Sequence, residues 1–148
     1  MNKDSYLISL SESEKTNFGK VEFQAQCTEQ KVFSAIWALE SQVNNGGFLQ
    51  YFSSWDGETA NFSPFALRQI GAAACAAIVE RALILVSKNA LPDNHKERNN
   101  LMNGLSSETT DMLSNIDSEF YAYPDNLTEL LFEYVRLNPN IFGPINQK

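Results

Sequence analysis

The sequence has few of the residues on which many enzymes and metalloproteins rely, with two cysteines and one histidine among 148 residues. Cys27 and Cys75 fit no metal-ligand spacing, and in a reducing compartment we expect both to be free thiols. His95 lies in the polar segment "PDNHKER", which is typical of a solvated loop. Motifs of zinc peptidases, calcium-binding loops and serine hydrolases are absent. We therefore expect no catalytic residue, metal or cofactor, and we predict that the protein is not an enzyme.

The sequence also lacks a long hydrophobic run. Its most apolar stretch, residues 70–79, stops at Glu80 and Arg81 and is too short to cross a bilayer. The first thirty residues are polar and charged, so no secretory signal is expected. These features predict a cytoplasmic protein that does not act at a membrane.

Basic residues are missing from one long segment, residues 99–135. This segment contains no lysine or arginine and seven acids: Glu108, Asp111, Asp117, Glu119, Asp125, Glu129 and Glu133. Its charge of −7 equals that of the whole chain, because the remaining acids and bases cancel. Such a balance disfavours nucleic acid and anionic membranes as partners and favours a cationic one. The alternative is that the charge only maintains solubility.

Apolar residues recur at helical spacing along most of the chain, and no segment shows the alternation of a strand. We expect helices over residues 3–10, from Thr28 onward, and over residues 65–70. An alanine-rich helix over residues 72–86 is apolar nearly all round, which is typical of the centre of a bundle. The sequence thus predicts an all-α, single-domain helical bundle (residues 1–148) with a central alanine-rich helix.

Two further helices are expected toward the C-terminus. One opens at residues 106–108, and the last begins after a cap at Asp125. In the last helix, Glu129 and Glu133 lie four residues apart on the outer side. The side chains expected to face inward are Leu127, Leu130, Leu131, Tyr134 and Leu137.

The stretch "QVNNGGFLQYF" poses a choice between a phosphate-binding loop and a turn. A phosphate loop follows a strand and uses a lysine, whereas here a helix precedes Gly46 and no base lies between Lys31 and Arg68. We expect Asn45-Gly46 to supply a left-handed residue that ends the helix from Thr28. Gly47 then allows close backbone packing.

Several motifs together resemble one bacterial family, the DNA-mimic-protein-like domain. They are "VNNGGFLQYF" at residues 43–52, Ala66-Leu67 with Ile70-Gly71-Ala72, Asp117 with Phe120-Tyr121, and Tyr134-Val135-Arg136 followed by Pro139 and Phe142. The likeness covers about residues 28–142. It implies an all-helical homodimer that occupies the DNA-binding face of a helix-turn-helix transcription factor and blocks operator binding, without contacting nucleic acid itself. Asp117, inside a motif, is expected to have a structural role.

Carboxylates are the candidate partner-binding groups. Seven in the acidic segment would make fourteen in a dimer, which matches the charge on roughly 24 Å of B-DNA. The candidates are Glu108, Asp111, Glu119, Asp125, Glu129 and Glu133, with Asp56 and Glu58 as weaker ones. The alternatives are an immunity-type inhibitor of a basic nuclease or toxin, a small-molecule enzyme using the Asn-Asn-Gly-Gly corner, and a scaffold without a ligand.

Overall fold

The computed structural model describes residues 1–145, in which α-helices and short 3-10 helices are connected by loops and no strand occurs. The predicted all-α class is confirmed. The elements in chain order are α1 (Lys3–Ser11), η1 (Phe23–Ala25), α2 (Thr28–Ser53), η2 (Trp55–Thr59), α3 (Ser63–Gln69), α4 (Ala73–Val86), α5 (His95–Asn103), α6 (Ser107–Tyr121), α7 (Leu127–Arg136) and α8 (Pro139–Phe142). None of the helices in this part of the chain has the length and apolar character needed to cross a membrane.

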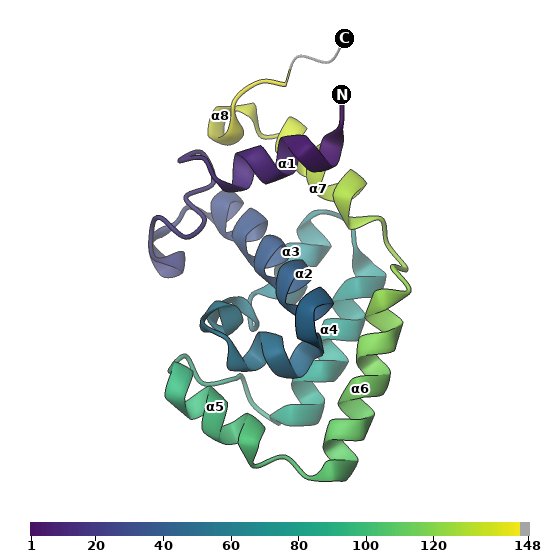
Figure 1. Ribbon diagram of the computed structural model, residues 1–148. Coiled ribbons are helices and arrows are strands. Elements are labelled where there is room, and N and C mark those ends of the chain that lie inside the picture. Colours follow the sequence, from purple (N-terminus) through teal and green to yellow (C-terminus); the bar gives the residue numbers. More distant parts are fainter. Residues whose placement is uncertain (146–148) are drawn as a thin grey trace.

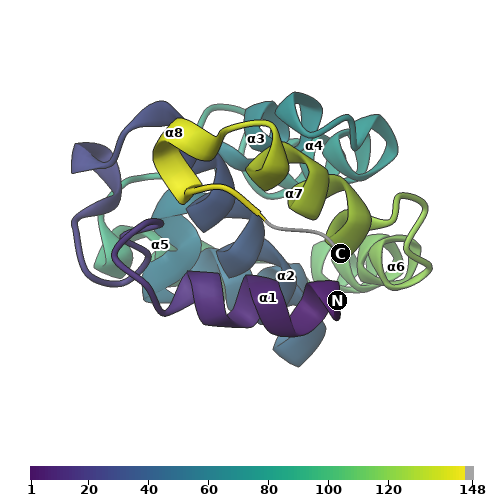
Figure 2. The ribbon, with the colours of Figure 1, turned by 90° about the horizontal axis from the view of Figure 1, so that it is seen from above.

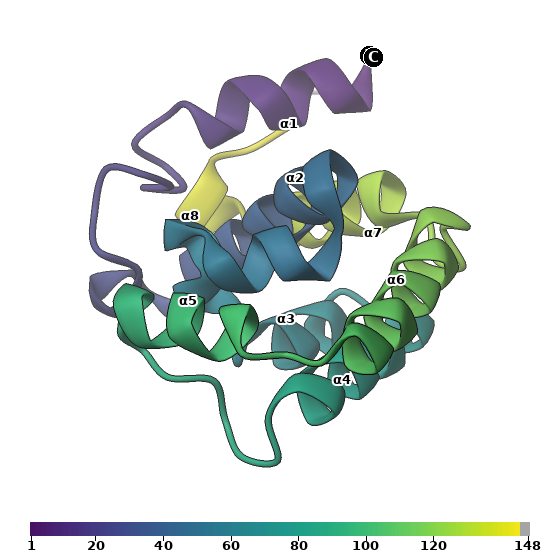
Figure 3. The same ribbon diagram turned by 60° about the horizontal axis from the view of Figure 1, so that its bottom comes forward.

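Helix α2 is the centre of the molecule. Its first half carries the predicted apolar stripe, and its second half buries Phe48, Tyr51 and Phe52 completely. Helices α1, α7 and α8 lie at the end of the molecule that carries the N-terminus, beside the first half of α2 (Figures 1 and 2). Helices α3, α5 and α6 contact α2 from other sides, with α5 at the end opposite α1 (Figure 1) and facing the viewer in Figure 3. One hydrophobic core joins these elements.

The alanine-rich helix α4 forms where it was predicted but does not occupy the centre. It packs between α3 and α6, and it leaves Ala73, Ala74 and Ala77 exposed to solvent. Ile84 on the same helix is 69% exposed. Apolar composition does not require burial, since much of any protein surface is apolar. The larger aromatic and aliphatic side chains of α2 gain more from the central position.

The two adjacent glycines interrupt α2: both have non-helical backbone angles, so the helix that begins at Thr28 ends there, as expected, and a second helical segment continues beyond the kink. The expectation for Gly46 is wrong by one residue: Gly46 has a φ of −162°, whereas Gly47 has a φ of +79° and is the left-handed residue. At this bend the backbone N–H of Phe48 donates to Asp117 Oδ1 of α6 at 2.9 Å. Asp117 therefore acts as an N-cap for the second half of α2, which confirms its expected structural role.

The space around Gly47 is occupied by the same carboxylate. A Cβ atom at Gly47 would lie 2.3 Å from Asp117 Oδ2. Burial raises the pKa of Asp117, and the bond from Phe48 opposes that shift. A glycine is thus required here for its conformation and for its lack of a side chain.

Asp125 does not cap the last helix, as the sequence had suggested. The N-cap of α7 is Asn126, whose side chain accepts from the Glu129 backbone N–H at 3.2 Å. Asp125 Oδ2 instead accepts from the backbone N–H of Cys75 at 2.8 Å, in the first turn of α4. Leu137, which was expected to face inward with the other apolar residues of this helix, is instead 62% exposed.

We predict that Gly47→Ala destabilises the fold more than Gly71→Ala. Gly71 has a φ of +86°, and a Cβ added there would have no atom within 4 Å, so its substitution introduces only left-handed strain, about 1 kcal/mol. Gly47→Ala adds displacement of the Asp117 cap, for a total of about 3 kcal/mol. Urea unfolding measures both values. Equal losses would show that the cap contributes nothing.

Candidate functional site

Three of the predicted partner-binding carboxylates form ion pairs within the chain. Glu119 pairs with Arg81 of α4 through both guanidinium nitrogens, and Glu129 pairs with Lys3 of α1. Glu133 pairs with Arg136 one turn further along α7. Residues 99–135 contain no base, but Lys3, Arg81 and Arg136 from other segments neutralise three of their acids.

These ion pairs reduce the charge that α6 and α7 present to a partner. The hydrogen bonds from Arg81 lower the pKa of Glu119, and those from Arg136 lower the pKa of Glu133. All the paired side chains are about half exposed, so each pair adds little to stability. A partner that used these carboxylates would have to compete with the bases already bound to them.

Glu108 and Asp111 differ from the other predicted acids of this segment. They lie three residues apart in the first turns of α6, both are exposed, and neither forms an ion pair within residues 1–145. Asp125 is committed to the cap of α4. Of the six stronger candidates, these two alone offer a free carboxylate in the described chain.

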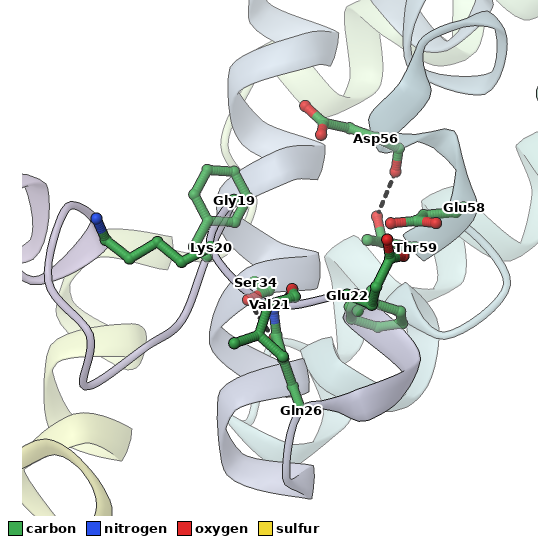
Figure 4. Close-up of a pocket in the computed structure, with 11 residues that line it drawn as sticks. Gly19, Lys20, Val21, Glu22, Gln26, Ser34, Asp56, Glu58 and Thr59 are labelled. Atoms are coloured by element: carbon green, nitrogen blue, oxygen red, sulfur yellow. Dashed lines mark hydrogen bonds between the residues drawn. The ribbon is translucent and has the colours of Figure 1, made fainter.

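The two weaker candidates, Asp56 and Glu58, belong to a larger group of acids around η2. Together with Glu22 and Asp93 they form what we call the η2 cluster, in which no member has an ion pair within the described residues. Glu22, Asp56 and Glu58 line a cavity of about 250 Å³, whose other walls include Phe18, Val21 and Phe23. Lys20, the only base in the lining, extends away from these carboxylates (Figure 4).

Like charges crowd one another in the η2 cluster. The pKa of Glu58 is raised first by burial and then by Glu22, with further contributions from Asp56 and Asp93. Arg98 opposes this shift without forming an ion pair with Glu58. The ionised form of Glu58 is therefore disfavoured in the fold, and a bound cation would offset that cost.

A buried arginine holds this region in place. The Arg98 side chain of α5 is 99% buried, and its guanidinium donates to the carbonyl oxygens of Phe52 at 3.1 Å and Ser54 at 3.0 Å. It also donates to the carbonyls of the turn before α5, including that of Asp93 at 2.7 Å. A Cβ at Gly57 would lie 2.9 Å from Arg98 Nε, so glycine allows η2 to approach the guanidinium. Arg98 thereby joins the end of α2, η2 and the Asp93 turn.

An exposed aromatic pair lies next to the cluster and was missed from the sequence. Trp55 of η2 is 75% exposed and stacks on His95 with ring centroids 3.7 Å apart and an interplanar angle of 10°. His95 opens α5, so the expectation of a solvated loop is wrong. An exposed tryptophan beside charged residues is typical of binding hot spots. A lone tryptophan in the polar stretch "SSWDGE" was the available signal.

Metal ligands do not converge at this site. Among residues 1–145 no three His, Cys, Asp or Glu side chains are grouped so that they could hold a metal ion. Cys27 is exposed and Cys75 is buried, and they form no disulfide. The arrangement favours binding of cationic groups on the surface.

We predict that Glu58→Gln raises the melting temperature at pH 7. Because the folded-state pKa of Glu58 is raised, its ionised form disfavours folding above that pKa, and the cost disappears as pH falls through it. The gain should therefore shrink toward pH 4. Glu14→Gln, outside the cluster, is the control for loss of one charge. A lower melting temperature for Glu58→Gln at pH 7 would contradict the electrostatic account.

Comparison with known families identifies a match over most of the chain. A family model described as DMP19-like protein, named for DNA mimic protein 19, matches residues 25–138. The matched residues include Gly46 and Gly47, Asp117, and every member of the η2 cluster except Glu22. Helix α1 lies outside the matched range. No significantly similar protein was found among curated proteins or among solved structures. Since the family model covers most of the chain, the protein belongs to the DMP19-like family of DNA-mimic proteins.

Proposed function

We propose that this protein is a cytoplasmic DNA mimic that binds the basic DNA-binding face of a helix-turn-helix transcription factor and blocks operator binding. It would do so without catalysis and without contacting nucleic acid. The observation that carries the proposal is the η2 cluster, four carboxylates that form no ion pair within residues 1–145 of a protein of the DNA-mimic family.

The chemistry of the η2 cluster suits such a partner. DNA-binding proteins use arginine and lysine to contact phosphates, and these side chains also bind carboxylates. A cation bound beside Glu58 would offset the repulsion that Glu58 experiences from Glu22 and, less strongly, from Asp56, so Glu58 gains more from a cationic partner than an isolated acid would. Trp55 adds an apolar contact at the edge.

Glu108 and Asp111 offer a second pair of free carboxylates. Helix α5 starts at His95 beside η2 and leads through a short loop to α6 (Figure 3). The two acidic groups therefore lie at the two ends of α5. We propose that the η2 cluster provides the main contact and that Glu108 and Asp111 extend it.

We predict that Glu22→Lys with Glu58→Lys weakens partner binding at least tenfold, about 1.4 kcal/mol. Both side chains are exposed and accept no hydrogen bond in the structure, so the fold should be retained. The reversed charges would repel a basic surface. The measurement is retention, at low salt, of proteins captured from native lysate on the immobilised variants.

The matched comparison is Glu129→Lys with Glu133→Lys, which makes the same change in net charge on α7. Because those carboxylates already bind Lys3 and Arg136, we expect a smaller effect. If this variant abolished binding and the η2 variant did not, the partner surface would lie on α7. A captured nuclease in place of a transcription factor would favour the inhibitor alternative.

We also propose that the protein is a homodimer. The groove between α4 and α6 has a volume of about 410 Å³ and is lined by Ile84, Leu85, Met112 and Ile116, among others. Ile84 is 69% exposed and Met112 48% exposed. Large apolar side chains that cluster on a surface are typical of protein interfaces. This face is the best candidate for the contact between two copies.

We predict that sedimentation at micromolar concentration shows a dimer for the wild type and a monomer for Ile84→Glu. A buried glutamate at a two-fold interface places a desolvated charge in each half of the contact. Leu137→Glu, on an exposed residue of a different face, is the control and should remain dimeric. A monomeric wild type would contradict dimerisation, and a dimeric Ile84→Glu would exclude this groove as its interface.

A further inference from the structure

A second polar cavity lies at the other end of the molecule, between α1, α2 and α7. Its narrower part has a volume of about 220 Å³ and is lined by Leu7, Ile8, Trp37 and Leu131 with Asp4 and Glu40. A wider part of about 500 Å³ shares Asp4, Glu40 and Thr128 and is bounded by Tyr123. Helix α1, which forms one wall, lies outside the family match at residues 25–138.

Polar side chains from three segments converge on Glu40. The Tyr123 hydroxyl donates to Glu40 Oε2 at 2.9 Å, and it accepts from Asn44 Nδ2 at 2.7 Å. Tyr123 has a φ of +50°, in the left-handed region that a bulky residue rarely adopts. Asp4 of α1 faces the same space, where Thr128 donates to its Oδ1 at 3.0 Å.

Among residues 1–145, the cavity has two acidic side chains and no lysine or arginine in its lining. Burial and the nearby Asp4 carboxylate both raise the pKa of Glu40, and the Tyr123 hydroxyl opposes this shift. Lys3, the base next to Asp4 in sequence, is bound to Glu129 and lies over the Phe132 ring.

We propose that this cavity binds a small primary alkylammonium ion. The ammonium lies between the carboxylates of Asp4 and Glu40, where it forms charge-assisted hydrogen bonds and cancels their repulsion. The alkyl chain lies along Leu7 and Leu131 in the narrower part, with the ammonium within reach of the Trp37 ring. An amine fits better than a divalent metal, which would need more than two carboxylates, and better than a neutral molecule, which would leave both charges unmatched.

Tryptophan fluorescence provides a direct test, because Trp37 and Trp55 are the only tryptophans and just Trp37 lines this cavity. In a Trp55→Phe background, n-pentylamine should change Trp37 emission saturably. The neutral isostere 1-pentanol should bind at least tenfold more weakly. Glu40→Gln keeps an acceptor for Tyr123 and removes the charge, so it should weaken amine binding at least tenfold.

Two further variants make the test independent of folding defects. Glu80→Gln removes a carboxylate paired with Arg68 outside the cavity and should leave amine binding unchanged. If Glu40→Gln failed to fold, Asp4→Asn, at an exposed position of α1, would replace it, with the same expected loss.

Each outcome decides the proposal. It is overturned if pentanol binds as tightly as pentylamine, if neither Glu40→Gln nor Asp4→Asn weakens binding, or if no saturable response occurs up to about 10 mM amine. Nα-acetyl-lysine-N-methylamide, which mimics a lysine within a protein chain, shows whether the site prefers a free amine or a protein lysine when its affinity is compared with that of pentylamine. Tighter binding of this compound would support the ammonium site and assign it to a lysine side chain.

Discussion

The hydrogen bond from the Phe48 N–H to Asp117 is the interaction on which the arrangement of the molecule depends. A helix cannot turn sharply without leaving backbone N–H groups unpaired, and in the core these need a partner. Asp117 provides it at the point where Gly47 turns the chain, and it fastens α6 to the central helix. The second half of α2 then runs in a new direction and ends at η2, where Trp55, Asp56 and Glu58 follow directly.

The η2 cluster shows a balance between stability and binding. Arg98 donates its guanidinium N–H groups to backbone carbonyls and so orders the main chain around η2. The nearby carboxylates have no salt-bridge partner in the described part of the chain. Burial, and after it the repulsion from Glu22, raises the pKa of Glu58. A solvated surface would lower this cost by placing a lysine among the acids. Rigid backbone beneath unpaired charge is suited to a preorganised binding surface, since a partner's cations meet carboxylates already in place.

The sequence predicted the fold class because helical periodicity is a local property, and the long apolar stripe of α2 or the Ser106 cap of α6 is read from neighbouring residues. It could not place the ion pairs, because Lys3 reaches Glu129 and Arg81 reaches Glu119 only after the chain has folded. The one-residue error at Gly46 concerns a similar contact: Asp117, distant in sequence, accepts from the Phe48 N–H directly after Gly47, which the local sequence does not reveal. The distribution of acids along the sequence therefore pointed to α6 and α7. The distribution of unpaired carboxylates in the described fold points to η2.

The central claim is that this protein competes with DNA for one surface of a transcription factor. The most direct measurement is elution of the protein captured from native lysate by the operator duplex of that factor, compared with a scrambled duplex at equal concentration. The account predicts that a helix-turn-helix protein is retained at low salt and released by its operator at concentrations where the scrambled duplex releases little. Retention that operator DNA cannot reverse, or the absence of any captured DNA-binding protein, would contradict it.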